Sequence, residues 1–213
     1  MTDMQPDKDA KMSFSMNLKM EDAPAKSKID RAEIQSNSSL FFSKDLSKLN
    51  MGGEMSLNNF DGTFQGSRME GYAMQADVKL TKDKDKIDLK PFSIRFEHKK
   101  ETAASMEAAG IYDQKKGEGQ FNLDVKNIDK KLLNLIGAYA GNIDFRDTAM
   151  TYKGDVKISD QNNKLEISGA LDVKRFSILA PQYLPKPTEE MDFSFIHKMV
   201  MDNKAQVLSI PTM

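Results

Sequence analysis

Few side chains in this sequence are of the types that carry out catalysis or bind metal ions. The chain has two histidines, His98 and His197, and no cysteine, so thiolate nucleophiles, disulfides and cysteine zinc sites are excluded. Each histidine follows an alternating apolar run, which predicts a position at a strand end near water. No G-x-S-x-G motif is present to hold a serine nucleophile on a strained turn. These residues predict no catalytic centre and no metal site.

Two short motifs only partly match known ligand-binding loops. Asp83, Asp85 and Asp88 are spaced like carboxylates of a calcium loop, but the central glycine and the terminal glutamate are missing. The Gly-Glu-Gly segment at 117–119 lacks the further glycine and the lysine of a phosphate-binding loop. We interpret the first motif as a solvated turn and the second as the opening of a strand. We therefore expect no enzyme activity and no cofactor.

The dominant signal is a strict alternation of apolar and polar residues. From residue 11 to residue 20 every even-numbered residue is large and apolar and every odd-numbered residue is polar. Successive side chains of a strand point to opposite faces, so this pattern predicts a strand with one apolar and one polar face. The alternation returns at 72–80, 92–96, 150–158 and 165–173. It predicts a mainly β fold, namely a long twisted antiparallel sheet curled into an apolar-lined trough.

Helical spacing is rare along the chain. After Asp129, a candidate N-cap, apolar residues recur at helical spacing and predict a helix at about 129–140. A shorter helical segment of one or two turns is expected at 43–49, before Gly52 and Gly53. So little helix can cover only a small part of the predicted apolar face.

Three further features predict how the strands turn or bend. Asp61-Gly62 lies between alternating runs and predicts a hairpin turn. Pro91 predicts an edge strand or an irregular one, because proline cannot donate to the sheet ladder. A change of phase near Lys174-Arg175 predicts a bulge or bend.

Charge and hydropathy exclude several functional classes. The formal net charge is -1, which gives no broad electric field for nucleic acid or an anionic membrane. No apolar run approaches the roughly 20 residues of a transmembrane helix. The first residues lack the apolar core of a secretory signal. We expect either a cytosolic protein or an internal piece of a longer one, and the abrupt ends favour a piece.

The apolar face is the candidate functional surface. Methylene groups gain roughly 0.8 kcal/mol each on burial without directional contacts, so a lipid site leaves only an apolar pattern in a sequence. Methionine, present 15 times, suits a surface that adapts to apolar partners. The residues expected to contact acyl chains are Met12, Phe14, Met16, Leu18, Tyr72, Met74, Val78, Leu80, Phe92, Ile94 and Phe96.

The chain resembles the AsmA-like and TamB-like bacterial envelope proteins. The resemblance is carried by residues 119–178, which include GQFNLDVKNIDKKLLNLIGAYAG and KLEISGALDVKRFSI, and by a second unit at 43–80. It implies that residues 1–213 are one β-rich segment of a longer, repeat-built periplasmic protein. It also implies an apolar trough that carries phospholipid from the inner to the outer membrane. Its partners would be acyl chains, neighbouring β segments of the same chain and the membrane, with no nucleic acid.

Other interpretations of the pattern stay open at this point. The apolar faces could pack on each other in a structural or adhesive β-sandwich with a dry core and no ligand. An outer-membrane barrel would turn the apolar face outward, but it requires aromatic girdles, and aromatic residues make up only 8% of the chain. An enzyme ranks last, because no set of residues supports one.

Overall fold

The strands form one antiparallel sheet in the order in which they occur along the chain. The computed structural model describes residues 6–22, 27–64, 67–139 and 143–210. Each strand pairs with the next, and β1 and β11 form the two edges of the described sheet. The strands are β1 (Ala10–Asp22), β2 (Ser27–Phe42), β3 (Lys48–Phe64), β4 (Ser67–Asp83), β5 (Lys86–His98), β6 (Glu101–Asp113), β7 (Glu118–Ile128), β8 (Ala149–Ser159), β9 (Lys164–Phe176), β10 (Met191–Asp202) and β11 (Val207–Ser209). The helix α1 (Lys130–Tyr139) lies between β7 and β8.

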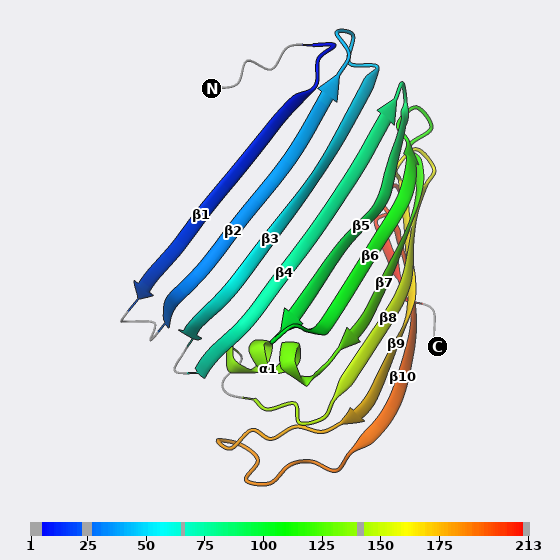
Figure 1. Ribbon diagram of the computed structural model, residues 1–213. Helices are drawn as coiled ribbons and strands as arrows, with labels where there is room; N and C mark the ends of the chain where they lie inside the picture. The colour runs from blue at the N-terminus through cyan, green and yellow to red at the C-terminus, as the bar shows by residue number, and fades with distance from the viewer. Residues whose placement is uncertain (1–5, 23–26, 65–66, 140–142, 211–213) are drawn as a thin grey trace.

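The sheet is curled, as the sequence predicted. In Figure 1 the strands lie side by side, and the C-terminal strands turn behind the middle of the sheet. The open curled sheet, with one helix among the described residues, confirms the predicted fold class. A sandwich would need a second sheet packed face to face on the first, and the described strands form a single sheet.

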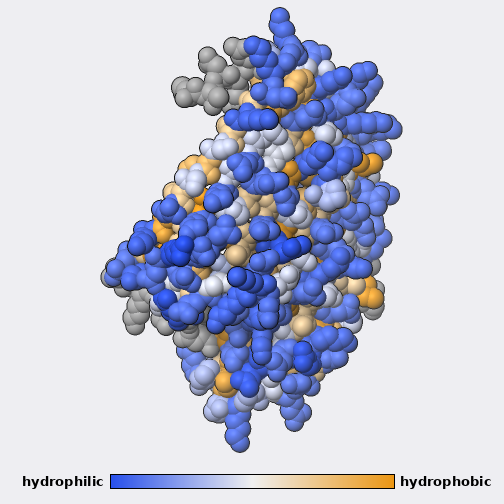
Figure 2. All heavy atoms as spheres, in the orientation of Figure 1, coloured by the Kyte–Doolittle hydropathy of each residue, from blue (hydrophilic) through white to orange (hydrophobic). Residues whose placement is uncertain are grey.

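Strand register keeps the apolar side chains on one face of the sheet. One apolar row crosses from β1 to β6 through Met16, Ile34, Leu57, Met74, Phe96 and Ala104. The neighbouring polar row crosses the other face through Ser15, Gln35, Ser56, Gln75, Arg95 and Ser105. Figure 2 shows the outer face, on which hydrophilic residues predominate. The apolar rows therefore line the inner side of the trough.

Most of the apolar rows are only partly shielded from water. Val173 is fully buried, and Ala103 and Ala104 are nearly so, but most of the larger inner side chains are half-buried or exposed. The reason is that a single sheet has no second layer over most of its apolar face. Helix α1 covers part of that face, since it contacts β6 and β7 and lines a cleft with β3, β4 and β5.

Two local predictions are wrong. Asp61-Gly62 is not a hairpin turn but lies inside β3, where the pairing with β2 and β4 shifts register. A Cβ on Gly62 would lie 2.5 Å from the carbonyl oxygen of Lys28, so glycine lets the neighbouring strand approach closely. The predicted helix at 43–49 is a turn at 44–47, and β3 begins at Lys48.

Three other local predictions are confirmed. Helix α1 begins directly after Asp129. β5 is irregular at Pro91, because its pairing with β6 shifts register between Leu89 and Phe92, although β5 is an internal strand and not an edge. The bend near Lys174-Arg175 is present, since the β9–β10 register shifts there and Arg175 has a φ of 48°.

Candidate functional site

Helix α1 is fixed at one end of the trough by its first residues. The side-chain oxygen of Asp129 accepts a hydrogen bond from the Lys131 backbone N–H at 2.9 Å, as an N-cap does. The Asp129 N–H donates to the carbonyl of Ala103 in β6 at 3.0 Å. Leu133 is buried between the helix and the sheet. The cap thus sets both the start of the helix and its attachment to the sheet.

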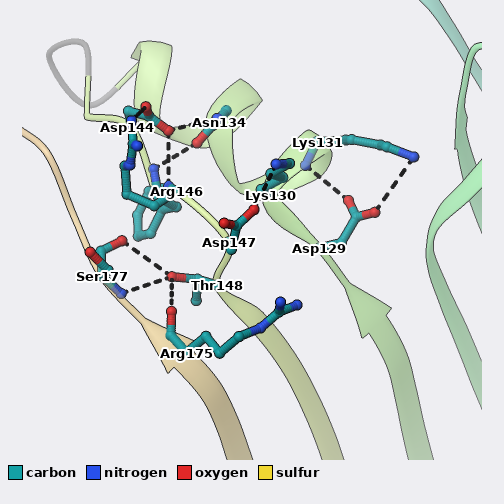
Figure 3. Close-up of polar contacts among 11 residues, drawn as sticks. Asp129, Lys130, Lys131, Asn134, Asp144, Arg146, Asp147, Thr148, Arg175 and Ser177 are labelled. Carbon is teal, nitrogen blue, oxygen red and sulfur yellow. Dashed lines mark hydrogen bonds and ion pairs between the residues drawn. The ribbon is translucent and has the colours of Figure 1, made fainter. Parts of the chain in front are cut away.

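The chain leaving α1 is held by a polar network (Figure 3). The Asn134 side chain donates to Asp144 at 3.0 Å and accepts from the Phe145 N–H at 2.7 Å. Lys130 forms an ion pair with Asp147 at 2.7 Å. Because one amide side chain binds both a carboxylate and a backbone group, the loop after the helix is tied to the helix itself.

A buried hydroxyl joins this loop to β9. The Thr148 hydroxyl lies within 3.3 Å of the carbonyl oxygens of both Arg175 and Ser177, and it accepts from the Ser177 N–H at 3.1 Å (Figure 3). Thr148 is 1% exposed and Ser177 is 3% exposed. Burial of polar groups costs little when they are hydrogen-bonded in this way. The contact anchors the start of β8 beside the bend in β9.

An aromatic pair supports α1 from the sheet. The Tyr72 hydroxyl donates to the Lys131 carbonyl at 3.0 Å, and the Tyr72 ring lies 4.7 Å from the imidazole of His98. Burial raises the pKa of Tyr72 and lowers that of His98, with Lys99 and Lys131 lowering the latter further. His98 is the last residue of β5, as predicted, but it packs on a ring at the end of the trough.

An ion pair links α1 to β6 at the same end of the trough. The ammonium of Lys131 contacts the carboxylate of Glu101 at the start of β6. The hydrogen bond lowers the pKa of Glu101 and raises that of Lys131. Because Glu101 is largely exposed, the pair positions the helix more than it stabilises the fold.

An apolar cleft lies between α1 and the sheet. Its volume is about 430 Å³, and it is open on one side. The lining side chains come from β3, β4, β5 and α1 and are almost purely apolar, namely Leu57, Phe60, Met69, Tyr72, Ala73, Met74, Phe96, Leu135 and Ile136. Such a lining can exclude water and hold alkyl groups, and the hydroxyl of Tyr72 is already donated to the Lys131 carbonyl.

All eleven residues predicted to bind lipid lie on the inner face of the sheet. Tyr72, Met74 and Phe96 meet in the cleft under α1. Met12, Phe14, Met16 and Leu18 line the edge strand β1, and Val78, Leu80, Phe92 and Ile94 continue the same face along β4 and β5. The structure therefore places them on one surface but gathers only three in one cleft. Their contact with lipid stays a prediction.

Six lining residues of the cleft were missed by the sequence analysis. Leu135 and Ile136 carried a usable signal, because their helical spacing predicted an apolar helix face that must cover something. Leu57, Phe60, Met69 and Ala73 lie near irregular register, where the alternation is broken. Their position in the cleft depends on where the helix docks.

A second histidine lies on the inner face and not at a strand end. His197 is in the middle of β10, so the predicted strand-end position is wrong for this residue. Its Nε2 is 3.0 Å from the Tyr152 hydroxyl, and the rings stack with centroids 5.8 Å apart. The Tyr152 side chain lies over Gly154 and Gly169, where an added Cβ would come within 2.4 and 2.5 Å of its hydroxyl. The two glycines thus make room for a tyrosine lying flat across the sheet.

Within the described ranges, no group of three or more His, Cys, Asp or Glu residues could hold a metal ion. No helix in the described part of the chain is long and apolar enough to cross a membrane. No family model, curated protein or solved structure matches this chain.

Proposed function

We propose that this chain is a non-enzymatic lipid-binding segment that holds phospholipid acyl chains against the inner face of its curled sheet. The observation that supports this most is the continuity of the apolar rows, which reach from β1 to β10 without a covering layer over most of their length. Soluble proteins rarely leave such a large apolar surface without a partner.

The cleft under α1 is the proposed holding point for one acyl chain. Its lining from Leu57 to Ile136 offers contacts on the sheet side and on the helix side. Along the rest of the trough an acyl chain can slide, because apolar contacts have no directional preference. The polar pair of Tyr152 and His197 is one place on this face where an ester or phosphate oxygen would find a hydrogen-bond donor.

The proposal extends to the cell envelope through the resemblance of residues 43–80 and 119–178 to AsmA-like proteins. On that basis the chain acts in lipid transport between the inner and outer membranes, or in outer-membrane assembly, as part of a longer periplasmic protein. Neighbouring β segments of the longer chain would lengthen the trough.

Lipid analysis of the purified protein tests the proposal. Phospholipids should be extracted from protein purified without detergent and identified by mass spectrometry, and the protein should take up a fluorescent phospholipid. The absence of both extracted lipid and uptake would contradict the proposed function.

Two adjacent residues of β4 provide a matched pair of variants. Met74 points into the cleft and Gln75 to the outer face, so Met74→Asp and Gln75→Asp add the same charge on opposite sides. An unpaired carboxylate in an apolar site costs more than the about 1–3 kcal/mol of a neutral polar group, which predicts at least a roughly tenfold loss of uptake for Met74→Asp. Gln75→Asp should bind as the unmodified protein does. Equal effects of the two variants would exclude the inner face as the lipid surface.

A further inference from the structure

Strand β1 leaves a long, regular backbone edge without a pairing partner. It spans the 13 residues Ala10–Asp22, and among the described residues it pairs only with β2. The irregularity between Leu18 and Met20 adds its extra residue to β2, so β1 itself keeps strict alternation. The opposite edge differs, because β11 has only three residues. A long unblocked edge strand is a template for pairing with another strand.

Several apolar side chains of β1 are also largely exposed to water. The exposed fractions of Met12, Phe14, Met16 and Met20 are 44%, 54%, 37% and 53%. On the polar face, no ion pair within the described part of the chain uses Lys11, Lys19 or Glu21. Glu21 lies opposite Lys28 in β2, but the Lys28 ammonium pairs with Asp30. The side chains on both faces of β1 can therefore contact those of a strand added at its edge.

A second copy of β1 in antiparallel orientation fits this edge in one register. When Met16 lies on the two-fold axis, all 13 residues of the strand are paired and the apolar side chains of both copies share one face. Lys11 then faces Glu21 of the second copy, and the symmetry repeats this pair at the other end. Met12 faces Met20, and Phe14 faces Leu18.

Neighbouring registers are less favourable. With Ser15 on the axis, Lys11 would face Lys19 of the other copy twice, and like charges directly opposite each other destabilise a strand pair. With Asn17 on the axis, Ala10 and Lys11 would have no residue opposite them, so the pairing of Lys11 with Glu21 would be lost. Charge and length thus select the same register.

We propose that this chain forms a two-fold symmetric dimer in which β1 pairs with β1 of a second copy and joins the two sheets into one. The interface is isologous, since each copy contributes the same strand. The row that contains Met16 continues from one inner face to the other, so the exposed β1 side chains gain cross-strand neighbours. This proposal does not depend on lipid binding.

Charge reversal tests the register in the full 213-residue chain. Sedimentation velocity at micromolar concentrations should show a dimer. Lys11→Glu places carboxylates opposite each other at both ends of the interface and should weaken dimerisation about tenfold or more. The double variant Lys11→Glu with Glu21→Lys should restore it, because the pairs re-form with reversed sign. Lys19→Glu is the matched control, since Lys19 faces the neutral Ser13 and its reversal should leave the dimer intact.

Single cysteines locate the interface independently, because the chain has no cysteine of its own. Met16→Cys should be cross-linked to a covalent dimer by a short thiol-to-thiol reagent. Met55→Cys, on the same face in β3, should not be. Circular dichroism and the thermal transition show whether each variant folds. A monomer at every concentration would overturn the proposal, and so would a dimer that is unaffected by Lys11→Glu and not cross-linked through Met16→Cys.

Discussion

At the scale of single residues, Gly137 is a position where helix propensity and close packing favour different side chains. Glycine is the weakest non-proline helix former, yet it lies in the interior of α1. Its carbonyl accepts a hydrogen bond from the Ile143 N–H at 3.0 Å, and an added Cβ would lie 2.0 Å from the Ile143 carbonyl oxygen. The absent side chain lets the returning chain cross the helix closely.

Gly137→Ala should therefore destabilise the protein, although alanine has the higher helix propensity. Propensity alone favours alanine by about 1 kcal/mol, whereas overpacking costs about 1–3 kcal/mol, and the obstructing atom belongs to the backbone. Urea unfolding of the variant and of the unmodified protein measures the difference. Increased stability would show that the helix and the following loop separate easily.

His98 should make stability depend on pH near neutrality. Its pKa in the folded protein is lowered by burial, by Lys99 and by Lys131, while Asp129 and Glu101 act in the opposite direction. Above the unfolded pKa of about 6.5 the imidazole is neutral in both states. As the pH falls below that value the unfolded state takes up the proton first, so the free energy of unfolding decreases until the folded pKa is passed.

The His98→Gln variant provides the comparison for this titration. It should lack the decrease in the unfolding free energy between pH 6.5 and the folded pKa of His98. An NMR titration of His98 should give a pKa below 6.5. A value above 6.5 would contradict the packing of the imidazole on Tyr72.

At the scale of elements, short polar motifs fix the places where the chain changes direction. The β2–β3 turn is organised by Asp45, whose carboxylate accepts from the Ser43 hydroxyl at 2.6 Å and from the Ser47 N–H and hydroxyl at 3.1 and 2.8 Å. Asp129 caps α1 in a similar way. Each carboxylate satisfies backbone groups that a turn or helix end leaves without partners.

The turn at Asp45 should lose stability in acid. Its hydrogen bonds hold the pKa of Asp45 at about 2, below its ordinary value of 3.8. The contribution of the carboxylate is complete above the unfolded pKa and is lost as the pH falls from about 4 to about 2. Amide exchange of Ser47 should accelerate over this range. Asp45→Asn keeps an acceptor oxygen and removes the titration, so its exchange should not show this acid step.

At the scale of the whole molecule, the sheet gains stability from neighbours on both sides of each strand. The central strands β4 to β8 have two paired neighbours, whereas β1 has one and the free edge of β10 is covered only at its end by β11. With no second layer behind most of the sheet, strand pairing provides most of the contacts.

Hydrogen exchange should therefore show a gradient across the sheet. Amides of β4 to β8 should exchange most slowly, and those of β10 and β11 faster, because edge segments open locally at lower free energy. In the Lys11→Glu variant, peptides from β1 should exchange faster than in the unmodified protein. Measurement by mass spectrometry with peptide resolution tests this. Uniform protection would indicate a covering layer outside the described sheet.

The sequence by itself determined the local patterns. Alternation at 11–20 and 72–80 predicted strands with one apolar face, and Asp129 predicted the start of α1. These features were readable because the period of side chains along a strand or helix, and the cap of a helix, depend on neighbours within a few residues.

Only the tertiary structure determined which residues these strands and this helix contact. Asp61-Gly62 forms a register shift instead of a turn, because the backbone of β2 approaches Gly62. His197 stacks on Tyr152 because β8, β9 and β10 are paired in one particular register. The cleft exists because α1 brings Leu135 and Ile136 opposite Leu57 and Phe96. Whether the sheet stays open or forms a sandwich depends on whether its apolar face packs against a second sheet. Such contacts join residues far apart in sequence, and local alternation carries no information on the distance between them.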